Sequence, residues 1–370
     1  MSAWKERKLG EVASFSYGKM PDKNRVKEIG VFPIFSGYQI TGYYDEYNSD
    51  EDLIIVARGV GGTGNVKISP KHSYVTNLSI IAKLDCNIVD KKYIYYNYLI
   101  NNLRYLDSGS AQSQITISDL QREPIIFPPL PEQRAIASVL SSLDDKIDLL
   151  HRQNKTLEAM AEVVFRYFFV DNRKAFWQEC TVSKLADHEK ISINPNRNPN
   201  TLFYHYSISA FDEMQMPICE LGSLIQSNKY KVTKNKILFS KLNPHKDKRV
   251  WLIPSSIPEN SICSTEFQVL NPKAEEYLPF LYCFISHPGN YDEIAAGVGG
   301  TSSSHQRIDP EVLFKFKCFL PDDTTLTSYN EMVKPIFEKI HHNRESMQAI
   351  IRLRDLLLPK LMSGEVRVKL

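Results

Sequence analysis

A strongly basic stretch between Lys229 and Arg249 is the first part of this sequence that could bind a ligand by its charge. It holds eight lysine or arginine residues against the single acid Asp247, a local net charge of +7, whereas the whole chain carries only +2. Clustered lysine and arginine side chains neutralise the phosphates of nucleic acids. A solvated lysine-rich face of a domain has the same composition, so both interpretations stay open at this point.

Two polar segments flanked by glycine form a second group of candidates. Residues 109–114 read Gly-Ser-Ala-Gln-Ser-Gln, and residues 299–307 read Gly-Gly-Thr-Ser-Ser-Ser-His-Gln-Arg. Such side chains reach base edges and phosphates from loops, although a simple turn from a domain into a helix explains the segments equally well. The candidate DNA contacts are Arg58, Lys67, Lys71, Gln112, Gln114, Lys229, Lys231, Lys241, His245, Lys248, Arg249, His305, Gln306 and Arg307.

A glycine-rich motif at Arg58–Gly64 matches the pattern G-x-G-x-x-G of dinucleotide-binding folds. In those folds the motif follows a strand and opens a helix. Here the next residues, Asn65–Ser69, have the composition of another strand, so the motif predicts a hairpin loop. A Walker-type G-x-x-x-x-G-K-[ST] motif is missing from the sequence, and we expect no nucleotide hydrolysis by this chain.

Residue types that serve catalysis or metal binding do not occur at the required spacings. The Asn-Pro steps at Asn194 and Asn198 do not continue into the Pro-aromatic pair with which amino-methyltransferases hold a flipped base. The six cysteines lie far apart in the sequence, outside any metal-ligand spacing. We expect a non-catalytic chain with buried reduced thiols and no metal. With no apolar run near the ~20 residues of a membrane span, we also expect no membrane contact and a cytoplasmic protein.

The elements that position these residues are duplicated. The segment Trp4–Ala13 returns as Trp177–Ala186, with the tryptophan, two apolar positions and the alanine in the same register. The step Leu130-Pro131-Glu132 before one long helix returns as Leu320-Pro321-Asp322 before another. Internal duplication predicts pseudo-symmetry, and a pseudo-symmetric protein suits a partner with two similar faces, such as duplex DNA.

Apolar residues repeat at alternating spacings of three and four in two long segments, which predicts two long helices with coiled-coil seams. One seam runs from Ile136 to Phe168 with Asn154 near its centre, and the other runs from Val333 to Leu361 with Asn343 near its centre. Each Asn either occupies a solvated gap or fixes the register of the pair. Because the second globular segment lies between the two helices in the sequence, we expect the helices to be antiparallel.

The first globular segment has the pattern of short strands and turns. Strands are expected at Phe32–Phe35, Leu53–Ala57, Asn65–Ile68 and Leu78–Ala82, and a helix is expected at Lys91–Leu103. Gly and Asn-Asp breaks separate the strands.

Together these features resemble the specificity subunit of type I restriction-modification enzymes. The resemblance covers the whole chain and includes the Trp-initiated halves and the strand pair Leu53–Arg58 and Ile237–Leu242. Its most specific part is the helix entry Pro128–Ala137, and the C-terminal Leu356–Val366 also fits. In the second half the helix entry has changed to Leu-Pro-Asp-Asp.

The resemblance implies two target-recognition domains that each read one half of a bipartite, asymmetric site on double-stranded DNA, with the paired helices setting the unread spacer. It also implies two docked modification subunits that bind S-adenosylmethionine and methylate adenine, and restriction subunits that use ATP and Mg²⁺. None of this chemistry is expected in the present chain, so we expect cofactors only on its partners.

We therefore expect an α+β fold with two mixed α/β target-recognition domains, separated by an antiparallel coiled coil of two long helices and related by pseudo-two-fold symmetry. The expected boundaries are 1–130 and 171–320 for the domains, and 131–170 and 321–370 for the helices. Two alternatives are a fused DNA methyltransferase-specificity protein and a coiled-coil scaffold that binds no DNA. The missing Asn-Pro-Pro-aromatic motif argues against the first, and the basic stretch and polar loops argue against the second.

Overall fold

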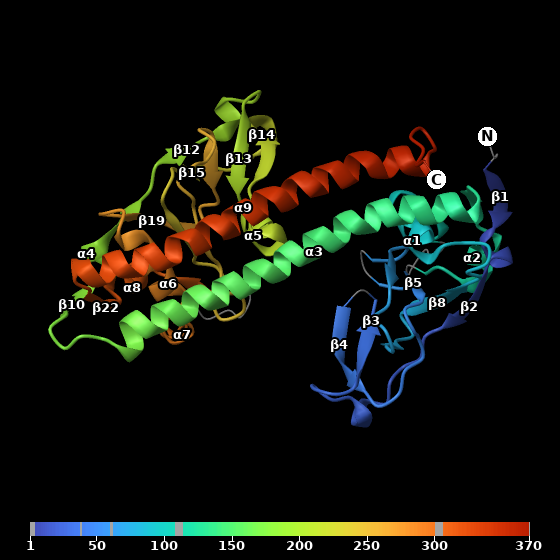
Figure 1. The fold of residues 1–370 in the computed structure, drawn as a ribbon, viewed down its shortest axis with the longest axis horizontal. Helices are drawn as coiled ribbons and strands as arrows, with labels where there is room; N and C mark the ends of the chain where they lie inside the picture. The colour runs from blue at the N-terminus through green and yellow to red at the C-terminus, as the bar shows by residue number, and fades with distance from the viewer. Residues whose placement is uncertain (1–3, 38, 60–61, 108–113, 300–305, 370) are drawn as a thin grey trace. The chain divides into compact units, whose positions relative to one another are not determined.

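The computed structural model describes residues 4–37, 39–59, 62–107, 114–299 and 306–369 (Figure 1). The chain forms two compact units: unit 1 comprises Met1–Lys146 with Ile350–Leu370, and unit 2 comprises Ile147–Ala349. Two long helices, α3 (Leu130–Arg166) and α9 (Asp323–Met362), contribute a segment to each unit. The predicted fold class, with two mixed α/β domains and a pair of long helices, is confirmed.

Unit 1 is built from three antiparallel or mixed strand groups. Strand β1 pairs with β9, the main sheet has the order β2-β8-β5-β6, and a smaller sheet has the order β4-β3-β7. The strands are β1 (Lys5–Lys8), β2 (Ala13–Tyr17), β3 (Phe32–Ser36), β4 (Gln39–Tyr44), β5 (Leu53–Val56), β6 (Val66–Ile68), β7 (Tyr74–Val75), β8 (Ser79–Leu84) and β9 (Pro124–Phe127). Its short helices are α1 (Lys91–Ile100) and α2 (Ile117–Arg122).

Unit 2 repeats this plan with an enlarged second sheet. Strand β10 pairs with β22, the main sheet has the order β11-β19-β16-β17, and the second sheet has the order β12-β15-β18-β13-β14. The strands are β10 (Gln178–Thr181), β11 (Ala186–Glu189), β12 (Ser192–Ile193), β13 (Leu202–Tyr206), β14 (Ile218–Leu221), β15 (Lys229–Lys231), β16 (Ile237–Ser240), β17 (Val250–Leu252), β18 (Ser261–Cys263), β19 (Phe267–Pro272), β20 (Val298–Gly299), β21 (Arg307–Ile308) and β22 (Lys317–Leu320). The short helices are α4 (Val182–Leu185), α5 (Ile208–Met214), α6 (Tyr277–Ser286), α7 (Pro288–Ala296) and α8 (Pro310–Lys315).

The internal repeat predicted from the tryptophan segments is confirmed by strand topology. Strands β2 and β11 begin at the equivalent alanines, Ala13 and Ala186. In the second sheets, β3 pairs antiparallel with β4 and parallel with β7, just as β13 pairs antiparallel with β14 and parallel with β18. Strands β12 and β15 have no counterpart among the described strands of unit 1, so the two units differ most in this sheet.

The core of each unit includes residues from both long helices. In unit 1, Ile136 and Leu140 near the start of α3 pack in one buried cluster with Leu358 and Leu361 near the end of α9. Pairing the start of one helix with the end of the other makes this segment antiparallel, as predicted.

Unit 2 contains the other segment of the helix pair, and it is antiparallel too. Ala161 and Phe165 of α3 share a buried cluster with Tyr329 and Val333 of α9. The ring of Phe165 lies 6.4 Å from that of Tyr329, centroid to centroid. Burial of aromatic side chains at this level is the main favourable term for docking a helix onto a domain.

The two central asparagines of the seams bond to each other inside unit 2. The Asn343 side-chain amide donates to Oδ1 of Asn154 at 2.8 Å, and both residues are buried. Of the two interpretations left open by the sequence, the solvated gap is therefore wrong. A buried Asn pair at a seam penalises shifted registers, because each shift leaves two amides unpaired.

Element boundaries differ slightly from those expected. Helix α1 ends at Ile100, and a short 3₁₀ helix at Leu103–Leu106 follows it. Helix α9 ends at Met362, because Gly364 adopts a positive φ of 75° that ends a helix by reversing the chain. The four strands expected in the first globular segment are present as β3, β5, β6 and β8.

The cysteine environment is only partly as expected. Cys263, Cys283 and Cys318 are buried and burial raises the pKa of each thiol, but Cys86 and Cys219 are exposed. Strand pairing also brings Cys180 opposite Cys318, with the two Sγ atoms 3.4 Å apart and no disulfide between them. The expectation that all six thiols are buried was wrong, because sequence spacing does not reveal that Cys86 lies in a surface turn and that Cys219 lies on an exposed part of β14.

Candidate nucleic-acid interface

A corner of unit 2 brings together residues from the basic stretch and from the second polar segment. At the end of β16 the Lys241 N–H donates to the carbonyl of Glu266 at 2.8 Å, and the Lys241 carbonyl accepts from the Ile308 N–H at 3.1 Å. The Asn243 N–H donates to the carbonyl of Gln306 at 2.9 Å. Backbone hydrogen bonds therefore fix Lys241, Gln306 and Arg307 at the C-terminal end of β16, a central strand of the main sheet, although Lys241 is 65 residues or more from the other two in sequence.

The Arg307 side chain is held by a carboxylate within this corner. Its Nε donates to Oε2 of Glu266 at 2.9 Å, and its Nη2 donates to Oε1 at 2.8 Å. The Arg307 side chain keeps 53% of its surface exposed, whereas that of Glu266 keeps 25%. The ion pair therefore orients an arginine whose other edge faces outward.

Other cations surround the corner. Burial lowers the pKa of Lys241, and the nearby Glu266 carboxylate opposes that shift. His188 stacks on Phe314 with ring centroids 5.1 Å apart, and burial together with Lys190 and Lys241 lowers its pKa to about 4. His188 is consequently neutral at pH 7, and the positive charge of the corner comes from the lysines and Arg307.

Unit 1 has an equivalent corner at the end of β5. The Ala57 N–H donates to the Leu78 carbonyl at 2.9 Å, and the Ala57 carbonyl accepts from the Ile115 N–H at 3.0 Å. These bonds match those of Lys241 with Glu266 and Ile308, so Gln114 occupies the place of Arg307 and Leu78 that of Glu266. Arg58, the next residue after Ala57, is exposed.

In each unit the corner is followed in sequence by a short helix whose first turn is capped by a side chain. Helix α2 begins after Thr116, whose side chain forms a reciprocal capping box with Asp119, and helix α8 begins after Asp309, whose carboxylate accepts from the Glu311 N–H at 2.8 Å. A side-chain cap satisfies an otherwise unpaired helix N–H and fixes where the helix starts. Gln114 and Arg307 therefore each lie two residues before the N-cap residue that fixes the helix start.

Strands β5 and β6, on either side of the glycine motif, pair antiparallel as the predicted hairpin requires, and the next element after the motif is the strand β6. Gly64 has a φ of 87°, and a Cβ at this position would lie 2.4 Å from the Arg104 backbone nitrogen. The glycine is required because the hairpin packs directly against the backbone of the segment after α1.

The remaining candidate contacts separate by burial. Arg58, Lys67, Lys71, His245 and Lys248 are exposed, Gln114, Lys231, Lys241 and Gln306 are half-buried, and Lys229 and Arg249 are buried. Gln112 and His305 lie outside the described residues.

Lys229, Arg249 and Lys248 are each engaged within the protein. Lys229 donates to the side chain and carbonyl of Ser227, at 2.5 Å and 3.2 Å. Arg249 binds Asp212 through two hydrogen bonds of 2.6 Å and 2.8 Å, and also bonds to Asp247 at 2.8 Å. Lys248 donates to the carbonyl of Ser286. The formal charge of the basic stretch therefore overstates the charge available to a ligand.

Several residues of the corner escaped the sequence analysis. Glu266, Lys190 and His188 approach Lys241 or Arg307, and Asn243 bonds to Gln306, yet none of the four belongs to a recognisable motif. The internal repeat is the one sequence feature that points to Glu266. Glu266 bonds to Lys241 through the same backbone hydrogen bond that joins Leu78 to Ala57 in unit 1.

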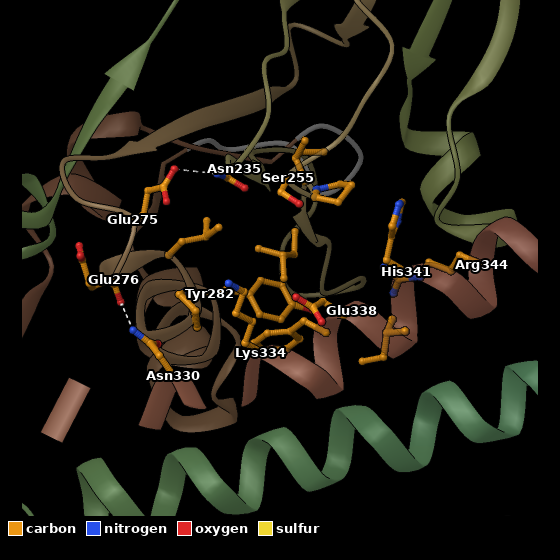
Figure 2. Close-up of a pocket in the computed structure, with 17 residues that line it drawn as sticks. Asn235, Ser255, Glu275, Glu276, Tyr282, Asn330, Lys334, Glu338, His341 and Arg344 are labelled. Atoms are coloured by element: carbon orange, nitrogen blue, oxygen red, sulfur yellow. Dashed lines mark hydrogen bonds between the residues drawn. The ribbon is translucent and has the colours of Figure 1, made fainter. Parts of the chain in front are cut away.

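A pocket of about 450 Å³ in unit 2 lies between α9 and the segment that contains α6 (Figure 2). Lys334, Glu338, His341 and Arg344 line it from α9, and Figure 2 shows Asn330 bonding to the carbonyl of Glu276, at 3.0 Å. The rim also carries the carboxylates of Glu275 and Glu276, which repel phosphate. The pocket contains none of the candidate contacts.

The described residues hold no group of three or more His, Cys, Asp or Glu side chains that could bind a metal ion. In the part of the chain that the structure describes, no helix is long and apolar enough to cross a membrane.

Comparison with known proteins finds similarity to one family. Residues 1–159 match the family described as Type I restriction modification DNA specificity domain. The type I restriction enzyme MjaIX specificity subunit of Methanocaldococcus jannaschii is 25% identical over 99% of this chain and 94% of that protein. The type I restriction enzyme HindI specificity subunit of Haemophilus influenzae is 21% identical over 79% of this chain and 81% of that protein.

A solved structure shares the fold. The crystal structure of the S subunit of a type I restriction-modification system from M. genitalium matches with a TM-score of 0.65 and 17% identity, covering 97% of this chain and 96% of that one. The family match over residues 1–159 and these relatives make the chain similar to the specificity subunits of type I restriction-modification systems, and the solved structure has the same fold.

Proposed function

We propose that this chain reads a bipartite site on double-stranded DNA, with one part read by residues 1–130 and the other by residues 171–320. The observation that carries the proposal is the repeated corner, where the same backbone hydrogen bonds present Gln114 in unit 1 and Arg307 in unit 2. Arginine and glutamine are the side chains that form paired hydrogen bonds with guanine and adenine edges. Because the equivalent positions carry different side chains, the two units are expected to prefer different bases, as an asymmetric site requires.

The exposed cations supply the sequence-independent part of binding in this proposal. Arg58, Lys67 and Lys71 are exposed on unit 1, and Lys231 and Lys241 are half-buried on unit 2. Phosphate contacts of this kind position a protein on the duplex but do not select a sequence. Lys229 and Arg249 support the fold around them instead.

The chain acts with partner subunits in this proposal. Two modification subunits dock on it, bind S-adenosylmethionine and methylate adenine, and restriction subunits supply ATP- and Mg²⁺-dependent cleavage. An exposed apolar stripe at the end of α3 and in the π-helical turn that follows it, Tyr167–Asp171, supports docking. Met160, Val163 and Tyr167 recur at helical spacing and are 49%, 67% and 60% exposed. In this proposal the cofactors and the catalytic residues lie on the partner subunits.

The decisive experiment is methylation mapping of the assembled complex. The chain is co-expressed with its modification subunits in a host without restriction systems, and methylated adenines are mapped by single-molecule sequencing. We expect one bipartite motif that vanishes when this chain is omitted. Methylation that persists without the chain would exclude a recognition role.

A fused methyltransferase is the competing function from another class. Calorimetry of the isolated chain with S-adenosylmethionine separates the two, and the pocket of Figure 2 is large enough to make this test necessary. We expect no binding by the chain alone and stoichiometric binding after the modification subunits are added.

A further inference from the structure

We propose that Arg307 reads a guanine in the DNA half-site recognised by unit 2, and that Glu266 is the residue that positions it. This inference rests on the proposed function and adds a specific base to a specific side chain. Four features of the corner support it: the geometry of the ion pair, the fixed backbone, the exposure of the guanidinium, and the contrast with unit 1.

The ion pair with Glu266 leaves the Nη1 and Nη2 end of the Arg307 guanidinium available to a base. Nε and one N–H of Nη2 bond to the two Glu266 oxygens, at 2.9 Å and 2.8 Å. A guanidinium has five N–H donors, so the second N–H of Nη2 and the two of Nη1 remain. The outer N–H groups of Nη1 and Nη2 form a parallel fork, and guanine presents two acceptors, O6 and N7, to such a fork in the major groove.

The backbone on both sides of the pair is fixed before any ligand binds. Arg307 lies in β21, bonded to β20 on one side and bridged to Leu242 on the other. Glu266 accepts from the Lys241 N–H through its carbonyl, and its own N–H donates to Oγ of Ser264 at 3.2 Å. An arginine that is already oriented loses less side-chain entropy on binding than a free one, which favours base recognition over a diffuse charge contact.

Exposure and charge also suit a base contact. Arg307 is half exposed, whereas the buried Arg249 has its guanidinium bonded to Asp212 and Asp247. Glu266 neutralises one charge of the corner, while Lys190 and Lys241 remain close enough to attract the phosphates that flank the base. A carboxylate beside an arginine weakens a pure phosphate contact but strengthens selection for a base that offers only acceptors to the arginine.

Unit 1 lacks this arrangement at the equivalent place. Leu78 occupies the position of Glu266 and offers no carboxylate, and Gln114 occupies the position of Arg307. The guanine preference is therefore expected in only one half of the site, which gives the experiment an internal control.

The test is methylation mapping of the assembled complex with Arg307→Ala, Arg307→Lys and Glu266→Gln. We expect Arg307→Ala to accept any base at one guanine position of the unit 2 half-site, with discrimination at that position reduced about 5- to 150-fold. Arg307→Lys should behave similarly, because lysine keeps the charge but loses the fork. Glu266→Gln should relax the same position partially, since it weakens only the support.

Lys317→Ala is the matched control, because Lys317 is an exposed cation of unit 2 that pairs with Glu179 at 2.8 Å. It should leave the motif unchanged. Thermal unfolding of each variant confirms that the chain is folded in the tested complex.

Three outcomes overturn the inference while leaving the proposed function intact. These are a wild-type half-site without any G·C pair, an Arg307→Lys complex with the unchanged motif, and an Arg307→Ala complex that methylates all sites equally weakly, as loss of a phosphate contact would. If the wild-type complex methylates no defined motif, the proposed function itself fails.

Discussion

The indole N–H of Trp177 donates a hydrogen bond to Oδ2 of Asp322 at 2.9 Å. The same carboxylate accepts from the Thr325 N–H at 3.0 Å and the Thr325 hydroxyl at 2.7 Å, and it pairs with Lys174 at 3.1 Å. Asp322 therefore caps α9 and at the same time binds the segment that follows α3. This contact joins the two ends of the second globular segment to each other.

The Asp322 carboxylate should make unit 2 sensitive to acid. Its hydrogen bonds, led by Thr325 and followed by Trp177 and Lys174, hold its pKa well below the ordinary value of 3.8. A depressed folded-state pKa gives stability that is present above pH 4 and is lost as the pH falls below the unfolded value. We expect Asp322→Asn to lower the unfolding temperature at pH 7, and expect the difference from wild type to shrink between pH 4 and pH 2.

Asp323→Asn is the matched control, since Asp323 is the adjacent exposed acid. It should follow the wild-type pH curve. Parallel curves for Asp322→Asn and wild type from pH 7 to pH 2 would show that the charge of Asp322 contributes nothing to folding.

Unit 1 has a related joint that involves the other end of the chain. Glu132, the counterpart of Asp322 in the repeated Leu-Pro-acid step, lies 3.6 Å from Arg367 beyond the end of α9. A Cβ on Gly364 would lie 3.2 Å from Cζ2 of Trp4, so the C-terminal segment packs against the first tryptophan. The segment after α9 thus packs against Trp4 in unit 1, and the segment after α3 leads directly into Trp177 in unit 2.

A circular permutant should therefore fold and keep its specificity. In this permutant a short flexible linker joins the native termini, and the chain is opened between Asn172 and Arg173. The connection after α9 is thereby closed, and the connection after α3 is opened. The new ends lie in an exposed turn, where new termini are tolerated. We expect an unfolding temperature within a few degrees of wild type and the same methylated motif.

A permutant opened between Leu238 and Phe239, inside the fully buried strand β16, is the control and should fail to fold. Equal solubility of the two permutants would show that the position of the opening is irrelevant. An insoluble first permutant would contradict the near-circular path inferred from Trp4 and Gly364.

Features repeated locally in the sequence could be predicted, whereas features made by long-range pairing could not. The helix seams and the tryptophan repeat depend on spacing along the chain, and the structure confirms both. The Arg249–Asp212 ion pair and the approach of Cys180 to Cys318 depend on which strands and helices meet. The net charge of a segment carries no information about such partners. The basic stretch therefore gave no warning that Lys229, Lys248 and Arg249 bond to other residues of the chain.

The buried asparagine pair should show strong coupling between its members. Asn343→Leu leaves Oδ1 of Asn154 buried without its donor, which costs about 1–3 kcal/mol of unfolding free energy. The double variant Asn154→Leu/Asn343→Leu removes both polar groups, so we expect it to recover most of that loss or to exceed wild-type stability. Urea denaturation of the four proteins gives the coupling energy, and additive losses would mean that the hydrogen bond contributes nothing.

The exposed stripe at the end of α3 and the start of the π-helical turn after it should contribute to docking of modification subunits. Val163→Glu places a charge at the centre of the stripe formed by Met160, Val163 and Tyr167. Because the position is exposed in this chain, the unfolding temperature should stay unchanged, while co-purification with modification subunits should fall at least tenfold. Lys155→Glu on an exposed position of the same helix is the control. Unimpaired assembly of the Val163→Glu chain would exclude the stripe as the docking surface.

Substitutions of Arg249 and of the Arg58 and Lys67 pair should separate structural from DNA-binding cations. Arg249→Ala leaves Asp212 and Asp247 without their shared guanidinium, so we expect a loss of about 1–3 kcal/mol of unfolding free energy. The exposed pair Arg58→Ala/Lys67→Ala should leave unfolding unchanged and reduce the salt dependence of DNA binding by roughly one unit of slope per lost phosphate contact. Filter binding of the assembled complex at several salt concentrations measures that slope. A reduced slope for Arg249→Ala at unchanged stability would reverse the assignment and place the buried arginine on the DNA.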